Sequence, residues 1–157
     1  FLTPFSENLG EALEAFKTRQ ADDGIELHAL LVLLSGVALR SGGTRPQRLD
    51  IFMRLLGLAY TQGQGHLRKF LKSEYGPVFQ QYMALVTAAT PELSDADRFW
   101  RIHFMLGATM FTLSGVDSLT AMAEHDLGEP TNVAQVVDQL LPFLGAGLKA
   151  PALKKSV

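Results

Sequence analysis

Apolar residues recur every three to four positions along most of the chain, and strict alternation of apolar and polar residues is rare. This spacing is typical of amphipathic α-helices, whereas a half-buried β-strand would alternate. The sequence therefore predicts an all-α fold of six or seven helices. The helices are expected at about Ser6–Gln20, Ile25–Leu39, Leu49–Thr61, His66–Ala89, Ser94–Leu113, Asp117–His125 and Val133–Leu148.

Polar residues and one proline mark expected ends and interruptions of these helices. Ser6 and Ser94 are expected N-caps, because a serine oxygen accepts hydrogen bonds from first-turn N–H groups. Thr131 or Asn132 should cap the last helix in the same way. A proline inside a helix removes a backbone donor and clashes with the preceding turn. We therefore expect a kink or a break at Pro77.

The helix expected at 94–113 is apolar on two faces, and the second face contains Trp100, Phe104, Gly107 and Phe111. Such a helix must be buried on two sides, one of them against a second partner. The last helix has a similar pattern, and two helices from each of two chains would form a four-helix bundle. A central core helix in a monomer is the alternative. The residues expected at the dimer interface are Phe99, Ile102, Leu106, Gly107, Thr109, Leu113, Val133, Val137, Leu140 and Leu144.

The second, third and fourth expected helices are rich in leucine, methionine and phenylalanine, which suit a core and an apolar pocket alike. Arg54 could anchor the carboxylate of an amphipathic ligand, or pair with Asp50 four residues earlier. Tyr82 and His103 could contact a ligand or hydrogen-bond within the core. The residues expected to bind a ligand are Phe52, Arg54, Leu55, Leu56, Phe79, Tyr82, Met83, Val86, His103, Phe104 and Phe111.

Composition and charge exclude several classes of function. The 157-residue chain has 14 basic and 16 acidic residues. The resulting net charge of -2 is unfavourable for binding of this chain alone to the phosphates of DNA. The absence of cysteine excludes disulfides, thiolate metal sites and cysteine nucleophiles. No two histidines lie three or four residues apart, and no nucleophile-elbow, phosphate-loop or dinucleotide motif is present. We therefore expect no metal, no cofactor, no catalytic residue and no enzyme activity.

The sequence also bears on where the protein works. The longest uncharged run, Tyr75–Pro91, contains two glutamines and ends in proline, so we expect no membrane span. No signal peptide is visible, and with the lack of cysteine this predicts a cytoplasmic protein. Because the sequence starts at Phe1 rather than at methionine, we interpret residues 1–157 as one domain of a longer protein.

Four segments resemble the C-terminal domain of TetR-family transcriptional regulators. They read IFMRLLGLAYT at 51–61, GHLRKFLK at 65–72, FWRIHFMLGATMFTLSG at 99–115 and PFLGAGLKAP at 142–151. The two middle segments are more narrowly similar to the fatty-acid-responsive regulators of Pseudomonas and related bacteria.

The resemblance implies an all-α homodimer that binds ligand and dimerises through residues 1–157. In the family, a helix-turn-helix module that precedes this domain, and is absent from this chain, binds the DNA operator. The second to fifth helices would enclose a long-chain fatty acid, and the ligand would release a repressor from DNA. The alternatives are another hydrophobic effector (a drug, an acyl-CoA or a quorum signal), a helical enzyme with an apolar pocket, or a dimerisation module without a ligand.

Overall fold

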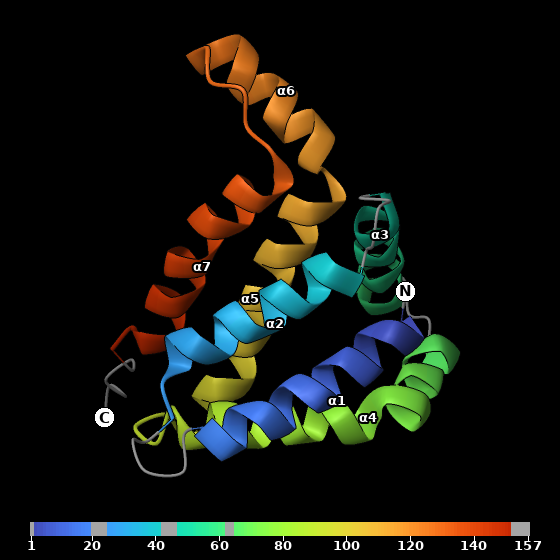
Figure 1. The fold of residues 1–157 in the computed structure, drawn as a ribbon, viewed down its shortest axis with the longest axis vertical. Coiled ribbons are helices and arrows are strands. Elements are labelled where there is room, and N and C mark those ends of the chain that lie inside the picture. Colours follow the sequence, from blue (N-terminus) through green and yellow to red (C-terminus); the bar gives the residue numbers. More distant parts are fainter. Residues whose placement is uncertain (1, 20–24, 42–46, 62–64, 152–157) are drawn as a thin grey trace, which may run out of the picture.

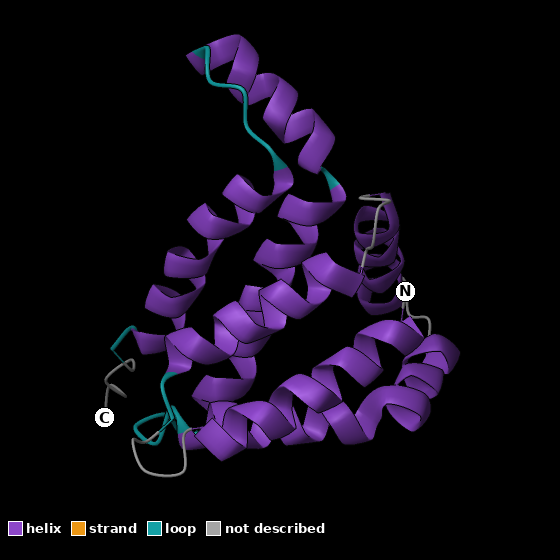
Figure 2. Ribbon diagram, viewed as in Figure 1, coloured by secondary structure: helices purple, strands orange, loops and turns teal. Residues whose placement is uncertain are grey.

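The computed structural model describes residues 2–19, 25–41, 47–61 and 65–151, which contain seven α-helices and no strand (Figures 1 and 2). The predicted all-α fold is confirmed. The helices are α1 Leu2–Arg19, α2 Leu27–Ser41, α3 Gln47–Thr61, α4 Gly65–Ala88, α5 Asp95–Ser114, α6 Val116–Leu127 and α7 Val133–Lys149.

Two of the predicted N-caps are confirmed. The Ser94 hydroxyl accepts from the backbone N–H of Asp97 at 3.1 Å. Asn132 and Gln135 form a reciprocal capping box, with N–O distances of 2.9 and 3.0 Å, at the start of α7. This box satisfies donors that the first turn of a helix leaves without an internal partner.

The predicted N-cap at Ser6 and the predicted break at Pro77 differ from the structure. Ser6 lies inside α1, because the helix begins at Leu2 and accommodates Pro4 in its first turn, where a missing N–H costs no hydrogen bond. Pro77 lies within α4, which is helical on both sides of it, so the alternative of a break is wrong. Tyr82 and Val86 of α4 are buried in the core, and such packing supplies most of the stability of a helix in a protein.

The core is formed by side chains from α1, α2, α3, α4, α5 and α7. Helix α1 packs against α2 and α4, while α5 packs against α3 on one side and α7 on the other. Helix α6 extends away from this body, and α7 returns beside α5 (Figure 1). The largest fully buried apolar side chains are Leu9, Leu13, Leu27, Leu30, Val37, Val86 and Leu148.

A buried arginine joins α4 to α5. Arg98 is only 8% exposed, and its guanidinium donates to the backbone oxygens of Thr90 at 2.9 Å and Leu93 at 2.8 Å. It also donates to the Thr90 hydroxyl at 3.1 Å and to the Asp95 carboxylate at 2.8 Å. These bonds satisfy carbonyls in the turn after α4, where the helix supplies no donor.

Three further arginines donate to carbonyls at the ends of helices. Arg68 donates to Ala59 at 2.7 Å near the end of α3, and Arg54 donates to Ser114 at 3.0 Å at the end of α5. Arg101 of α5 donates to the last residues of α7 and to the chain that follows. A cation in this position is favourable because the C-terminal end of a helix carries partial negative charge.

Replacing Arg98 with alanine should lower the free energy of unfolding by about 1–3 kcal/mol, because the carbonyl of the buried residue Leu93 loses the arginine donor. Urea unfolding followed by circular dichroism measures this change. The control is Lys69→Ala on the exposed part of α4, which should leave the midpoint unchanged. Equal midpoints for the two variants would contradict the assigned role of Arg98.

Candidate functional site

A row of large apolar side chains is exposed on α5 and α7. Phe104 and Phe111 of α5 are 66% and 71% exposed, and Phe143 of α7 is 67% exposed. Trp100 is exposed too, and its ring stacks on that of Phe104 with centroids 6.0 Å apart. We call these four residues, with the exposed Gly107, the α5–α7 face. Soluble monomers seldom leave such a patch uncovered, so the face is typical of an interaction surface.

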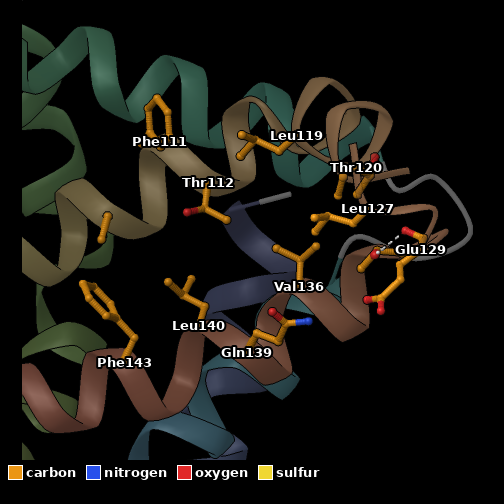
Figure 3. Close-up of a pocket in the computed structure, with 13 residues that line it drawn as sticks. Phe111, Thr112, Leu119, Thr120, Leu127, Glu129, Val136, Gln139, Leu140 and Phe143 are labelled. Carbon is orange, nitrogen blue, oxygen red and sulfur yellow. Dashed lines mark hydrogen bonds between the residues drawn. The ribbon is translucent and has the colours of Figure 1, made fainter. Parts of the chain in front are cut away.

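A hollow of about 480 Å³ lies between α5, α6 and α7, next to this face (Figure 3). Leu127, Val136 and Leu140 point into the space between the three helices. The described lining consists of Ala108, Phe111, Thr112, Leu119, Thr120, Ala123, Leu127, Glu129, Thr131, Val136, Gln139, Leu140 and Phe143.

The connection between α6 and α7 places a carboxylate at the edge of this hollow. Gly128 ends α6 with φ 70, a left-handed conformation that favours glycine, and its N–H donates to Glu124. The chain then turns back toward α7 and carries Glu129 past the hollow (Figure 3). Among the described lining residues, Glu129 is the only charged one.

The predicted ligand-binding residues of α3 and α4 lie in several environments. Val86 is fully buried in the core, while Phe52, Leu56 and Met83 are half-buried against it. Leu55 and Phe79 are exposed, and the Phe79 ring lies 6.0 Å from that of Phe5. The sequence predicted a hollow between α2, α3, α4 and α5, but the hollow described here lies between α5, α6 and α7. Of the predicted ligand residues, Phe111 lines it.

Tyr82 is a core residue of the structure. Its hydroxyl donates to the backbone oxygen of Leu30 at 3.2 Å, and the side chain is buried between α2 and α4. Burial raises the pKa of the Tyr82 phenol above its usual range, because the charged form loses its hydration. Of the two alternatives that the sequence allowed for Tyr82, the structure shows the hydrogen bond within the core.

Arg54 and His103 have protein partners. The Arg54 guanidinium lies 3.5 Å from the Asp50 carboxylate, as the spacing of four residues allowed, and also donates to Ser114. The His103 Nδ1–H donates to the Phe99 carbonyl at 2.7 Å, and the two rings lie 4.1 Å apart. Both side chains remain partly accessible.

Two classes of site are not found in the part of the chain described. No group of three or more histidine, aspartate or glutamate side chains there is arranged to hold a metal ion. None of the described helices has the length and apolar character that a membrane span requires.

A family of protein domains described as tetracyclin repressor-like, C-terminal domain, matches residues 34–147, which is most of the chain. This chain is a tetracyclin repressor-like C-terminal domain. No curated protein matches it. Membership supports a role in a transcriptional regulator as the part that binds ligand and dimerises, and such regulatory domains are typically not enzymes.

The repressor-like domain buries some of the residues expected at the dimer interface in its own core and leaves others exposed. Leu113, Val137 and Leu144, expected at the dimer interface, are buried in the chain's own core. Ile102, Val133 and Leu140 pack against the same core. Leu106 and Thr109 are half-buried, whereas Phe99 and Gly107 are exposed.

Several residues of the α5–α7 face and of the hollow were not among the predicted site residues. Trp100 and Phe143 belong to the α5–α7 face of the domain, and Leu119, Ala123 and Leu127 bring α6 to the hollow. The stripe that contains Trp100 was visible in the sequence, but an apolar pattern does not tell which stripe meets the chain's own core. The position of α6 follows from its connections to α5 and α7.

Replacing Tyr82 with phenylalanine should cost about 1 kcal/mol at neutral pH, because Leu30 loses its side-chain donor. The pKa of Tyr82 is higher in the folded than in the unfolded state. The unfolded state therefore loses this proton first, and stability should fall as pH rises above about 10. The Tyr82→Phe variant should show a weaker fall, while Tyr60→Phe, at an exposed ring, serves as the control. Urea titrations at pH 7 and pH 11 measure both effects, and identical pH dependence in the two variants would contradict the assignment.

Proposed function

We propose that this domain senses an apolar effector and dimerises within a transcriptional repressor that releases DNA when a long-chain fatty acid or a similar molecule binds. The α5–α7 face is the observation that supports the dimer, because each of its aromatic side chains is more than half exposed among the described residues of a single chain. Two copies of α5 and α7 would pack as a four-helix bundle, the arrangement the sequence predicted from different residues.

The composition of the α5–α7 face supports pairing with a second copy. Burying one large apolar side chain contributes about 1.5–3 kcal/mol. Gly107 lies midway between Phe104 and Phe111 on the same stripe, and a glycine there lets a partner helix approach closely. A glycine inside a helix costs about 1 kcal/mol relative to alanine, and close packing at the interface offsets that cost.

Gly107→Leu should abolish or weaken the dimer at least tenfold without harming the fold. Beyond the neighbouring backbone of α5 itself, no atom of the described residues lies within 4 Å of where a Cβ would stand at this position, so the single chain has room for the side chain. The matched control is Gly57→Leu on α3, a half-buried position where a Cβ would likewise meet no neighbouring side chain of the described residues within 4 Å. Sedimentation equilibrium with circular dichroism measures both variants. A Gly107→Leu dimer as tight as the wild type would refute the proposed interface.

The proposed fatty-acid site lies on the side formed by α3 and α4. Ile51, Leu55 and Leu58 form one exposed apolar stripe of α3, and Phe70 and Phe79 are exposed on α4. An acyl chain gains about 0.8 kcal/mol for each CH₂ removed from water, so this surface suits a long chain. The sequence resemblance to fatty-acid-responsive regulators supports the same ligand.

The proposed switch acts through a DNA-binding module that precedes this domain in a longer protein. A ligand shifts the regulator toward release only if it binds the DNA-incompetent dimer more tightly than the competent one. A coupling of roughly 1–3 kcal/mol is typical of such switches. Helix α1 would connect the DNA-binding module to this domain. A tilt of α1 would change the distance between the two DNA-binding modules of the dimer, whose half-sites lie about one DNA turn apart.

Arg54 is the proposed anchor for the fatty-acid carboxylate, since its guanidinium is at the surface of α3 beside the apolar stripe. Binding of saturated fatty acids should tighten by about fourfold per added CH₂ until the site is full. Arg54→Gln should remove the preference for hexadecanoic acid over hexadecanol, which a purely structural role of Arg54 would leave intact.

Titration calorimetry of the chain with both hexadecyl compounds measures this preference. Arg40→Gln at the exposed end of α2 removes the same charge elsewhere and serves as the control. An acid-over-alcohol preference that persists in Arg54→Gln would exclude Arg54 as the anchor.

A further inference from the structure

We infer that the hollow between α5, α6 and α7 is a second binding site, for a small apolar molecule that carries a cationic group. The hollow is distinct from the proposed fatty-acid surface on α3 and α4, and none of its described lining residues belongs to those helices. The inference therefore does not rest on the fatty-acid proposal.

The size and lining of the hollow fit a compact apolar ligand. The hollow is partly open to solvent, and its volume of about 480 Å³ lies within the range of small-molecule sites in proteins. Apolar side chains come from all three helices, with Phe111 on α5, Leu127 on α6 and Leu140 on α7. A ligand in this space would touch apolar groups on three sides.

The polar groups of the hollow favour a positive charge. Glu129 is an exposed acidic residue at the edge of the hollow, and the described lining contains no lysine, arginine or histidine. None of the ion pairs found among the described residues uses the Glu129 carboxylate. The Thr120 and Thr131 hydroxyls donate to nearby backbone carbonyls, so their protons already have partners. The Thr112 hydroxyl and the Gln139 amide are neutral groups, so among the described lining residues an anionic ligand would meet one fixed charge, and that charge is of like sign.

The second copy of the proposed dimer would border this site. Phe111 and Phe143 line the hollow and also belong to the α5–α7 face. A molecule bound beside these two rings would be further shielded from water when the face is covered. Binding of the cation and dimerisation should consequently reinforce each other, because such coupling is reciprocal.

Tetraphenylphosphonium and tetraphenylborate test this assignment, because they are nearly the same in size and shape and opposite in charge. In equilibrium dialysis at low salt, the cation should bind the dimeric chain and the anion should bind at least tenfold more weakly. Glu129→Gln should weaken binding of the cation about two- to fivefold, as expected for one exposed charge, and should narrow the difference between the two ions. Equal binding of the two ions by the wild type would overturn the proposal.

Substitutions that fill the hollow locate the site. Ala123→Phe on α6 and Thr112→Phe on α5 each place a ring in the hollow and should abolish binding of tetraphenylphosphonium. Ala121→Phe on the exposed side of α6 is the matched control and should bind like the wild type. Circular dichroism verifies the fold of each variant. Because two variants fill the hollow, the test still holds if one of them fails to fold. Binding that survives in a folded filling variant would overturn the proposal.

Two further measurements separate this site from the proposed function. Hexadecanoic acid should bind Ala123→Phe as it binds the wild type, and loss of its binding would show one shared site and overturn the inference. The Gly107→Leu variant should bind tetraphenylphosphonium more weakly than the dimer does. Tighter binding by that variant would show that the second copy itself fills the hollow, and would also overturn it. Failure of hexadecanoic acid to bind any variant bears on the proposed effector alone.

Discussion

The position of α5 depends on arginine side chains that donate to the ends of helices. Arg98 ties the first turn of α5 to the chain that leaves α4, and Arg101 ties α5 to the end of α7. Arg54 of α3 holds the last carbonyl of α5. Arg54 and Arg101 satisfy carbonyls at the ends of helices, where positive charge is favourable, and Arg98 satisfies carbonyls in the turn after α4. Because these contacts lie near both ends of α5, they fix its rotation as well as its place.

The rotation of α5 decides which of its two apolar stripes meets the core. The stripe that contains Leu113 turns inward, and the stripe that contains Phe104 and Phe111 turns outward. One helix thereby contributes to the core, to a surface suited to a second copy and to the hollow beside α6. Assembly and ligand binding are physically close in such an arrangement, which is what a regulatory domain needs for the two to influence each other.

The sequence predicted the helices well because their signals are local. Ser94 and Asn132 cap helices where expected, whereas Ser6 misled because Pro4 fits an earlier first turn. The outward stripe of α5 and the place of the hollow depend on contacts between residues far apart in the chain. The Asp50–Arg54 pair followed from spacing, but no spacing rule connects Arg54 to the carbonyl of Ser114.

The position of Trp100 has a consequence for the study of this molecule in solution. It is the single tryptophan of the chain, and it is 58% exposed on the α5–α7 face when one chain stands by itself. Indole emission shifts to shorter wavelength when water is excluded from the ring. The chain thus carries a natural fluorophore at the surface proposed for assembly. The wavelength of its emission maximum reports, without any label, whether that surface is exposed to solvent or buried.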